Sequence, residues 1–581
     1  MIARTSWPPL DRSRQRFALL VDFLDEAHEH EQSVVHGSLA AARELDAKLV
    51  VIAGGLVDTP DERLRAGNFA FDLVGRDNAL GIMVLSSALG NATGPKHLAE
   101  WLSRYGDMPL CCVGVPIPGY VSVQVDNATG ITEAVNHLIK VHGKQNIGFI
   151  RGPSQSEEAE VRYAAYRDAL LANGINPDPR WVAEGDYLRA SGSQAVRSIL
   201  DQKRVSVHAL DALVCANDYM ALGALEELGR RGINVPEQIA LTGFDDVASA
   251  VAARPSLTTI RQPSGELGRE GLKQLLLLAG GAPGPAECTL PVELKVRRSC
   301  GCTSIDLGLT PRQQSPGAAG SFEASLIQRR QVIVAELARS AQGSFGAAGS
   351  DWESPLLSAL IEEIRDGKQG ALSRRIQRLM LKLEHGGGDL AAAPAVLATL
   401  RRQALACVAA HSEARDRLED AISDAQLLAT AMLNQVAVTL TRQSVLRARA
   451  LVRQVQEQMF AGPELVSRAL AEHLPGLGVD ACVVAAVVGR SESGEWLGQV
   501  RFGFAPGKGH PASEALPLTR LIAHPLVESS RTLFLLPITL AGEILGVAAF
   551  SGTNQLARSD ILEDLRELFS TVLKVEQLRH A

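Results

Sequence analysis

The sequence predicts an α/β protein: a two-lobed, doubly wound α/β domain is followed by a helical segment and a small α+β domain. Three observations predict this order. Short apolar runs alternate with amphipathic patterns over residues 17–302, strong helix formers fill much of residues 321–462, and strand-like runs return within residues 463–581. The chain has 581 residues, of which 46% are hydrophobic and 21% charged, so wholesale disorder is excluded.

The first domain is predicted from continuous apolar runs that each end in Gly, Pro, Asn or Asp. Buried parallel strands have this pattern because helices cover both faces of their sheet. The intervening amphipathic stretches predict those helices, and the length of the domain suits two lobes rather than one. The strand-like runs are FALLVDF, KLVVIAGG, GIMVLSSA, LCCVGVP, NIGFIRGP, ALVCAND and IALTGFDD.

The remaining segments differ in texture. Residues 1–16 form a predicted N-terminal tail, and residues 303–320, rich in Gly, Ser and Pro, form a predicted linker. The 321–462 segment is predicted to be helical. One of its apolar stripes recurs in steps of three or four, at Leu418, Ile422, Ala425, Ala429, Met432, Val436 and Leu440.

Composition also restricts the compartment and the partners. With 58 Lys+Arg and 65 Asp+Glu the net charge is −7, which argues against a chain built to bind polyanions. Eight Cys are too dilute for a disulfide scaffold. The N-terminus lacks the apolar core of a secretory signal, and no apolar run is long enough to cross a membrane. We therefore expect a cytoplasmic protein that does not contact membranes.

Several segments in the first domain carry a resemblance to a known family. They are VSVQVDNATGITEAVNHLI with NIGFIRGP, VRYAAYRDAL, the triplet Gly185-Asp186-Tyr187, LVCANDYMALGALEELGRRGINVPEQIALTGFDD, PSLTTIRQP and VELKVRRSCGC. In this order and spacing, residues 17–302 resemble the effector-binding domain of the LacI/GalR repressor family, a periplasmic-binding-protein-like fold. The resemblance implies two lobes joined by a hinge, with a small ligand clamped between them.

The resemblance places Arg162, Tyr187, Asn217 and Asp245 against that ligand, beyond the carboxyl ends of parallel strands. Asp245 can accept hydrogen bonds from two adjacent hydroxyls, Asn217 can donate and accept, and Arg162 offers a planar fork of donors. Tyr187 supplies a flat face and a polar tip. This chemistry fits a polar ring such as a sugar or a nucleoside.

Asp218 and Asp246 follow the same two strands and are also candidate ligand-binding residues. An alternative interpretation is that they cap a turn or a helix, since Asp satisfies orphan N–H groups at such positions. Both interpretations stay open at this point.

No catalytic or metal site is predicted, and no cofactor. His28-Glu29-His30-Glu31 could chelate a metal, but polar residues at a strand-to-helix turn are usually solvated. Cys300-Gly301-Cys302 offers two thiols, yet a single C-x-C lacks the second pair that zinc needs. The sequence contains neither G-x-S-x-G nor H-E-x-x-H. We therefore expect the protein not to be an enzyme.

The sequence departs from the repressors before the first strand, where they carry a helix-turn-helix domain. Only 16 residues precede Phe17, whereas an independent domain needs on the order of 50 residues. Arg4, Arg12, Arg14 and Arg16 could touch phosphates, but such a run is more often a solvated flank. Weak or absent DNA binding is the expectation.

The whole arrangement also resembles bacterial multidomain sensors, in which a LacI-type domain without a helix-turn-helix precedes helices and a GAF-like domain. LFLLPITLAGEILGVAAF resembles a GAF-type strand pair, and residues 463–581 are the predicted GAF-like domain. Its inward residues Val483, Val484, Phe502, Phe504 and Phe550 are expected to be core. Such sensors usually end in a cyclase, kinase or DNA-binding output, and no such catalytic motif occurs here.

The resulting hypothesis is a cytoplasmic ligand-sensing protein that binds a small polar effector and relays its binding to a downstream regulatory protein, in transcriptional or signalling control. The alternative is a LacI-family transcriptional regulator that binds DNA through an unrecognised surface. The closing helix carries an a/d seam at Ile561, Leu565, Leu568, Val572 and Val575, which predicts a homodimer built with the 396–460 helix. Packing of this seam on the GAF-like sheet is the competing interpretation.

Overall fold

The computed structural model divides the chain into two compact units, Met1–Ile305 with Leu446–Ala581, and Asp306–Val445. It describes residues 16–24, 29–91, 93–282, 287–302, 322–341, 345, 349, 351–367, 369–385, 390–408, 413–458, 463–508, 515–552, 556 and 561–580. The first unit contains the predicted two-lobed domain and the C-terminal α+β region together.

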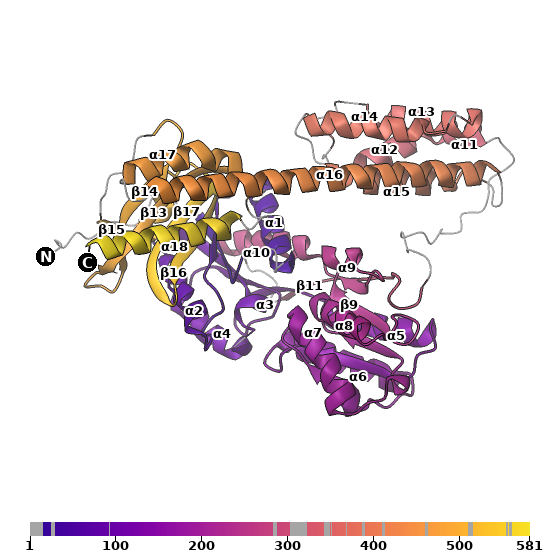
Figure 1. Ribbon diagram of the computed structural model, residues 1–581, viewed down its shortest axis with the longest axis horizontal. Helices are drawn as coiled ribbons and strands as arrows, with labels where there is room; N and C mark the ends of the chain where they lie inside the picture. Colours follow the sequence, from indigo (N-terminus) through magenta and orange to yellow (C-terminus); the bar gives the residue numbers. More distant parts are fainter. Residues whose placement is uncertain are drawn as a thin grey trace. The chain divides into compact units, whose positions relative to one another are not determined.

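The first lobe, called the N-lobe, is built on parallel strands. They are β1 (Arg16–Val21), β2 (Leu49–Ala53), β3 (Ala79–Leu85), β4 (Leu110–Val113), β5 (Val121–Val125) and β11 (Glu287–Leu290). Their spatial order is β11-β5-β4-β3-β1-β2. The first five of these strands in sequence lie in the indigo to violet part of the ribbon in Figure 1. Strands β1, β2 and β4 are fully buried and β3 nearly so, as their continuous apolar sequences predict, whereas β11 at the edge of the sheet is partly exposed. The order reverses between β1 and β3, the switch point of a doubly wound sheet.

The second lobe, called the C-lobe, repeats this plan. Its strands are β6 (Ile147–Arg151), β7 (Val182–Glu184), β8 (Ala212–Cys215), β9 (Ala240–Asp245), β10 (Thr258–Arg261) and β12 (Glu293–Lys295). They lie in the order β12-β10-β9-β8-β6-β7, with only β12 antiparallel to its neighbour. The corresponding switch point lies between β6 and β8. The predicted doubly wound, two-lobed fold is therefore confirmed.

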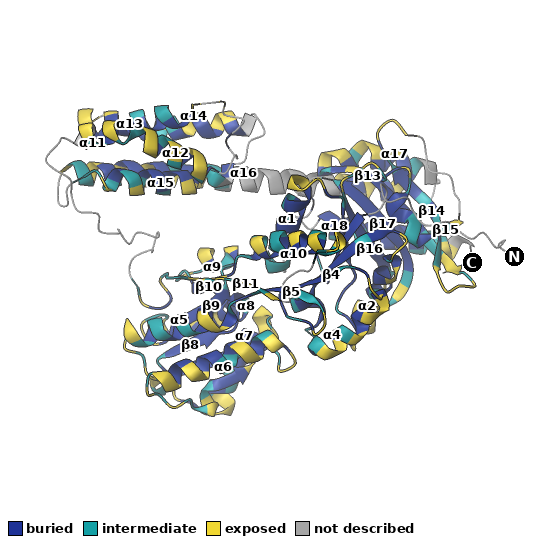
Figure 2. Ribbon diagram, turned by 180° about the vertical axis from the view of Figure 1, so that it is seen from behind, coloured by how far each residue is buried: buried dark blue, intermediate teal, exposed yellow. Residues whose placement is uncertain are grey.

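Helices cover both sheets. In the N-lobe they are α1 (Glu29–Glu44), α2 (Glu62–Arg65), α3 (Ser86–Leu89), α4 (Gly94–Leu102) and α10 (Ser264–Ala279). In the C-lobe they are α5 (Asn127–Lys140), α6 (Glu157–Ala172), α7 (Arg189–Arg197), α8 (Asp218–Arg230) and α9 (Ala248–Ala252). Figure 2 shows buried strands beneath helices whose outer faces are exposed. The chain changes sheets between β5 and β6, between β10 and β11, and between β11 and β12, so several segments join the lobes.

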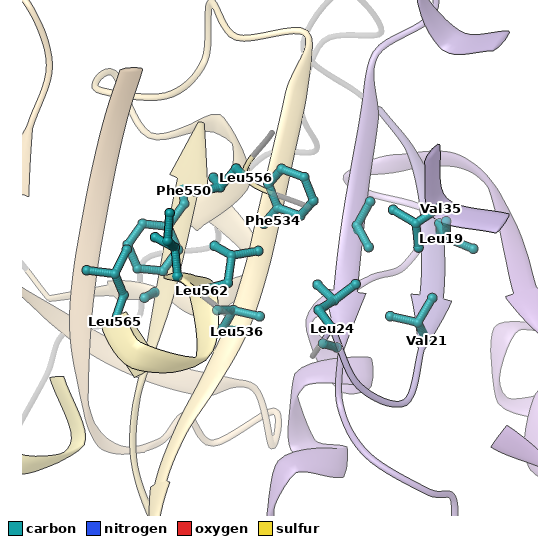
Figure 3. Packing of buried hydrophobic residues seen from close by; sticks show 14 of the residues in the cluster. Leu19, Val21, Leu24, Val35, Phe534, Leu536, Phe550, Leu556, Leu562 and Leu565 are labelled. Carbon is teal, nitrogen blue, oxygen red and sulfur yellow. The ribbon is translucent and has the colours of Figure 1, made fainter. Parts of the chain in front are cut away.

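The C-terminal α+β region continues the N-lobe sheet. It comprises α17 (Pro463–His473), β13 (Val479–Arg490), β14 (Trp496–Phe504), β15 (Ala515–Pro517), β16 (Thr532–Leu540), β17 (Glu543–Gly552) and α18 (Ile561–His580). Strands β16-β17-β13-β14-β15 lie side by side in this order, each antiparallel to its neighbour, and β16 pairs in parallel with β2 from Thr532↔Leu49 to Leu535↔Ile52. One sheet of eleven strands results. Apolar side chains from both regions form one core on its face (Figure 3).

Arg16 reinforces this junction. It was expected to lie on a solvated flank, but its side chain is buried and its guanidinium donates to the backbone carbonyls of Val527 (3.2 Å), Glu528 (3.2 Å) and Ser530 (2.5 Å). Burial lowers the pKa of Arg16 to about 10, so it remains charged at neutral pH. The expectation for Arg16 was wrong because its partners lie more than five hundred residues away in the chain. Arg4, Arg12 and Arg14 lie outside the described residues.

The seam of α18 packs inside its own chain. Ile561, Leu565, Leu568 and Val572 are each at most 7% exposed and belong to the core shared with the N-lobe, while Val575 is half-buried. The expected pairing of this seam with a second copy is therefore wrong, and the competing interpretation of packing on the sheet is correct. Val483, Val484, Phe502 and Phe550 are buried core, as expected, and Phe504 is half-buried against it.

The second unit is helical. Its elements are α11 (Phe322–Gln328), α12 (Arg330–Ser340), α13 (Glu353–Asp366), α14 (Ala371–His385), α15 (Ala393–Leu405) and the first part of α16 (Glu413–Gln458). On α16 the stripe residues Leu418, Ile422, Ala425 and Ala429 are buried in the core of this unit, and Met432 packs against it. The side chains of Val436 and Leu440 lie outside the described residues. Among the described residues, no helix is both long and apolar enough to span a membrane.

Candidate functional site

The candidate site lies at the carboxyl ends of the parallel C-lobe strands. Arg162 lies on α6, which follows β6, and Tyr187 follows β7. Asn217 and Asp218 follow β8, and Asp245 ends β9. Because parallel strands end at the same edge of their sheet, residues far apart in sequence come together here, around the switch point between β6 and β8.

Arg162 is 2% exposed and is held from several sides. Its Nε donates to Asn127 Oδ1 at 2.7 Å, and its Nη1 donates to the carbonyl oxygen of Ala216 at 2.7 Å. Its Nη2 lies 3.6 Å from Glu158 Oε1, and its guanidinium carbon lies 3.9 Å from the ring centroid of Phe244. These contacts fix the planar fork in one orientation at the strand ends.

Tyr187 has a backbone φ of +69°, which a residue with a Cβ rarely adopts. Its ring covers Gly152 so closely that a Cβ at that position would lie 2.4 Å from the ring. Its hydroxyl lies 3.4 Å from Ser156 Oγ, and burial raises the pKa of Tyr187 to about 12. The ring is therefore held in one place, next to the residues that connect β6 with α6.

Both polar atoms of the Asn217 side-chain amide form hydrogen bonds within the protein. Its Oδ1 accepts from the backbone N–H of Met220 at 2.9 Å and thereby caps α8, while its Nδ2 donates to the carbonyl oxygen of Tyr187 at 2.9 Å. The second bond stabilises the strained backbone of Tyr187. Contact between Asn217 and a ligand stays a prediction.

Asp245 combines backbone strain with a perturbed carboxylate. Its φ is +123°, and its Oδ1 accepts from Gln262 Nε2 at 2.5 Å. Burial raises the pKa of Asp245 to about 7, although the positive charge of Arg162 acts in the opposite direction. Strained backbone and a carboxylate that titrates near neutral pH are features that gather at functional sites.

Asp218 is fully buried beneath the strand ends. Its Oδ1 accepts from Thr259 Oγ1 at 2.6 Å and its Oδ2 accepts from the backbone N–H of Val247 at 3.1 Å, so it connects β10 with the loop after β9. Burial raises the pKa of Asp218 well above its usual range. The alternative interpretation, in which Asp218 caps its own turn or helix, gains no support from this geometry, because the N–H of Val247 lies 29 residues away and Asn217 caps α8.

Both carboxylate oxygens of Asp246 also accept hydrogen bonds from protein groups. Its φ is +64°, its Oδ2 accepts from Arg261 Nε at 2.6 Å, and its Oδ1 accepts from Arg297 Nη2. These arginines belong to β10 and to the segment after β12, so Asp246 connects the last strands of the C-lobe. For Asp218 and Asp246 ligand contact likewise remains a prediction, with their carboxylates already bonded to protein groups.

The N-lobe approaches this edge with the first turn of α1. His30 Nδ1 lies 2.9 Å from Ser264 Oγ, and burial lowers the pKa of His30 to about 4, so the ring is neutral at neutral pH. Glu29 Oε2 accepts from the backbone N–H of Ala248 at 2.7 Å, and its own N–H donates to Tyr219 Oη at 3.4 Å. The two lobes therefore touch at this point.

The metal interpretation of His28-Glu29-His30-Glu31 gains no support from these contacts, because Glu29 and His30 bond to different partners. His28 lies outside the described residues. A small cavity separates the lobes nearby. Its polar lining comes from the N-lobe residues Ser86, Ser87 and Asn91 and the C-lobe residues Gln155, Ser156 and Glu157.

The two switch points thus face one cavity. Ser86 and Ser87 follow β3 at the N-lobe switch point, and residues 155–157 follow β6 at that of the C-lobe. Ligands of doubly wound sheets bind at such points. Hydroxyl, amide and carboxylate groups line the space, and Tyr187 reaches it through Ser156. At about 10 Å³ the cavity holds no more than a water-sized molecule, so a larger polar ligand bound by these groups requires the lobes to move apart.

Comparison with known proteins agrees with this geometry. The family profile of the periplasmic binding protein-like domain matches residues 135–300. The HTH-type transcriptional repressor CytR of Escherichia coli K12 is 37% identical over 179 residues, which are 31% of this chain and 51% of CytR. The HTH-type transcriptional regulator CelR of Thermobifida fusca is 36% identical over 196 residues, 34% of this chain and 55% of CelR.

The matched region is a periplasmic-binding-protein-like domain of the LacI family. The chain spans about half the length of the curated relatives it matches. Solved structures with similar folds include the Escherichia coli transcriptional repressor ascG, at 27% identity and a TM-score of 0.39, covering 49% of this chain and 98% of that chain. A CelR–cellobiose complex has 28% identity and a TM-score of 0.42, covering 49% and 85%.

The comparisons also bear on the expected GAF-like domain, on DNA binding and on the function class. A GAF-like domain at residues 463–581 stays a prediction. The LacI-type relatives are named as HTH-type transcriptional regulators, so they give no support to the expectation of weak DNA binding. They are regulators by name and not enzymes, which agrees with the expected function class.

The raised pKa of Asp245 predicts how the free energy of unfolding depends on pH. The folded LacI-type domain binds more protons than the unfolded chain between the ordinary pKa of 3.8 and the raised value of about 7. The free energy of unfolding should therefore fall as the pH rises through this window, by less than about 1.4 kcal/mol per pH unit. Asp245→Asn should remove this contribution, so denaturant unfolding at pH 5, 6, 7 and 8 should show a shallower decline than in wild type. Parallel curves for the two proteins would show that Asp245 is not the titrating group.

Proposed function

We propose that this chain is a ligand-sensing regulatory protein, which binds a small polar effector, sugar-like or nucleoside-like, between the lobes of its LacI-type domain. The observation that carries the proposal is the convergence of Arg162, Tyr187 and Asp245 at the carboxyl ends of the C-lobe strands, where the charge of Arg162 acts on both of the other residues. The effector shifts the protein toward a closed form only as far as it binds that form more tightly.

The chemistry of the site supports a hydroxylated ring. Asp245 accepts hydrogen bonds from hydroxyl groups once it is ionised, and the charge of Arg162 favours the ionised form. Tyr187 supplies an aromatic face beside the cleft. The relatives support transcriptional control as the setting, since CytR, CelR and PurR are named as transcriptional regulators. We place the protein in the cytoplasm, acting as a homodimer through a regulatory partner.

A second candidate is direct DNA binding, favoured by the HTH-type names of the relatives. Both candidates share the same effector site. They differ in what the chain acts on, which is a regulatory protein in the first and DNA in the second. A gel shift with DNA from upstream of its own gene, at physiological salt, tests this candidate.

Thermal-shift screening with sugars and nucleosides tests the effector site. A true effector at a hundred times its dissociation constant should stabilise the fold by about 2.7 kcal/mol, which a melting curve detects easily. Asp245→Ala should abolish that stabilisation because the ligand hydroxyls lose their acceptor. Asp168→Ala, which removes an exposed carboxylate from α6, is the matched control and should respond like wild type. Equal affinity in Asp245→Ala and wild type would show that the effector binds elsewhere.

A further inference from the structure

A second group of side chains lies apart from the effector site. His137 in the last turn of α5, His142 just beyond that helix, and Cys300 and Cys302 after β12 direct one donor atom each toward a common point. All four donor atoms lie within 4.8 Å of one another, and neither cysteine belongs to a disulfide bond. Sequence analysis found that Cys300-Gly301-Cys302 lacked a second pair of ligands. The fold supplies that pair from more than 150 residues away.

The distances between the donors are those of a tetrahedral site. His137 Nε2 lies 3.3 Å from His142 Nε2 and 3.4 Å from Cys300 Sγ. Cys302 Sγ lies 3.4 Å from His142 Nε2 and 3.6 Å from His137 Nε2. Zinc–sulfur bonds of about 2.3 Å and zinc–nitrogen bonds of about 2.0 to 2.1 Å place the corners of a tetrahedron about 3.3 to 3.8 Å apart. Four of the six donor–donor distances therefore match those of a tetrahedral zinc site, and the other two, from Cys300 to His142 and to Cys302, are at most 4.8 Å.

The local backbone is built for this convergence. Gly301 has a φ of +109°, which allows the chain to turn so that the cysteines on either side face the same point. A Cβ at Gly301 would lie 3.2 Å from His142 Nδ1, so a side chain there would crowd the imidazole. Cys300 is 1% exposed, whereas Cys302, His137 and His142 are half-buried, so the group lies near the surface with one side sealed by protein.

We propose that His137, His142, Cys300 and Cys302 form a structural zinc site. Two thiolates and two neutral imidazoles give a neutral complex with Zn²⁺, which suits a half-buried position. All four corners are protein atoms, so no position is open for a water or a substrate, as in structural rather than catalytic zinc sites. Soft thiolate ligands select zinc over magnesium or calcium.

The position of the site indicates what it stabilises. Cys302 is the last residue described before residue 322, and the ion fastens this end of the LacI-type domain to α5. The first residue of that helix is Asn127, whose Oδ1 accepts from Arg162 of the effector site. One helix therefore connects the metal site with the candidate effector site. Metal binding itself does not depend on the proposed function.

The test is metal analysis of the full-length chain, produced without a polyhistidine tag. After equilibration with Zn²⁺ and dialysis, wild type should retain one zinc per chain by mass spectrometry of the metal. Cys300→Ser with Cys302→Ser should retain less than a tenth of that amount. Cys288→Ser removes a half-buried free thiol on β11 and should retain the full amount. Replacing zinc with Co²⁺ should give the absorption of a tetrahedral cobalt thiolate in wild type and in the control only.

Stability gives a second readout. A strong chelator should lower the melting temperature of wild type and of Cys288→Ser, but should leave that of the double variant unchanged. If the Cys300→Ser, Cys302→Ser variant does not fold, His142→Gln tests the zinc site instead, because His142 is only half-buried and its replacement disturbs the core less. Zinc retention by His142→Gln equal to wild type would overturn the proposal. So would a wild type that retains no zinc after reduction, or thiol titration that shows a Cys300–Cys302 disulfide persisting in the presence of Zn²⁺ and reductant.

Discussion

Arg162→Leu should bind the effector at least about a hundredfold more weakly than wild type, a loss of about 2.7 kcal/mol. The guanidinium is buried, and its donors serve Asn127 Oδ1 and the carbonyl of Ala216. Leucine leaves both acceptors without their donor and removes the positive charge beside Asp245 and Glu158. Hydrogen bonds to charged groups contribute about 1.5 to 3 kcal/mol each, so the effect is large.

Two matched variants separate binding from folding. Arg167→Leu changes an exposed arginine on the same helix and should bind like wild type. Arg162→Lys keeps the charge but loses the planar fork, so it should lie between the extremes. Because Arg162 lowers the pKa of Asp245, Arg162→Leu should also raise the pH at which that carboxylate ionises. Calorimetric titration and a pH series measure these effects. An affinity within threefold of wild type in a folded Arg162→Leu protein would refute the assignment.

The sequence predicted the plan of the LacI-type domain because its signals are local. Each of the seven apolar runs, five of which end in Gly, Pro, Asn or Asp, contains most or all of a buried strand. Parallel strands end at one edge, so their order alone brings Arg162, Tyr187 and Asp245 together. Side-chain roles were harder to predict. Asn217 caps α8 and holds Tyr187, and Asp218 connects β10 with the loop after β9, because buried polar groups need partners that a linear pattern does not name.

The junction between β2 and β16 had no signal in the sequence. An apolar run predicts a buried strand but does not identify its neighbour, and here the two strands are separated by nearly the whole chain. The same reason explains Arg16, whose acceptors lie in the turn before β16. His137 and His142 could have been found from their spacing at the end of one helix. Their pairing with Cys300 and Cys302 requires the tertiary fold.

The same limit explains the seam on α18. A repeat in steps of four and three identifies an apolar face but not what covers it, and in the structure the sheet covers it. A helix that was expected to pair with a second copy instead closes the core beneath β16 and β17. Replacing a buried seam residue of α18 with a charged residue should therefore lower the stability of the fold, and not only change the association state.

Leu568→Glu should unfold the C-terminal α+β region, because Leu568 lies in the core of that region and not on a surface that pairs with a second copy. Leu568 is 5% exposed in the core that contains Phe534 and Phe550 together with N-lobe side chains. Burying a carboxylate there should cost at least about 4 kcal/mol, a large part of the stability of a domain. Because β16 pairs with β2, the N-lobe should lose stability as well, and effector binding should fall with it.

Leu578→Glu is the matched control for this prediction, since Leu578 lies on the same helix and is 67% exposed. It should melt within a few degrees of wild type, whereas Leu568→Glu should melt far lower or be unfolded at room temperature. Circular dichroism, limited proteolysis and the effector thermal shift measure the three consequences separately. If Leu568→Glu kept the melting temperature and the ligand response of wild type, the shared core would not unite the two regions. If only the C-terminal α+β region became protease-sensitive while effector binding survived, the pairing of β2 with β16 would be too weak to couple their unfolding.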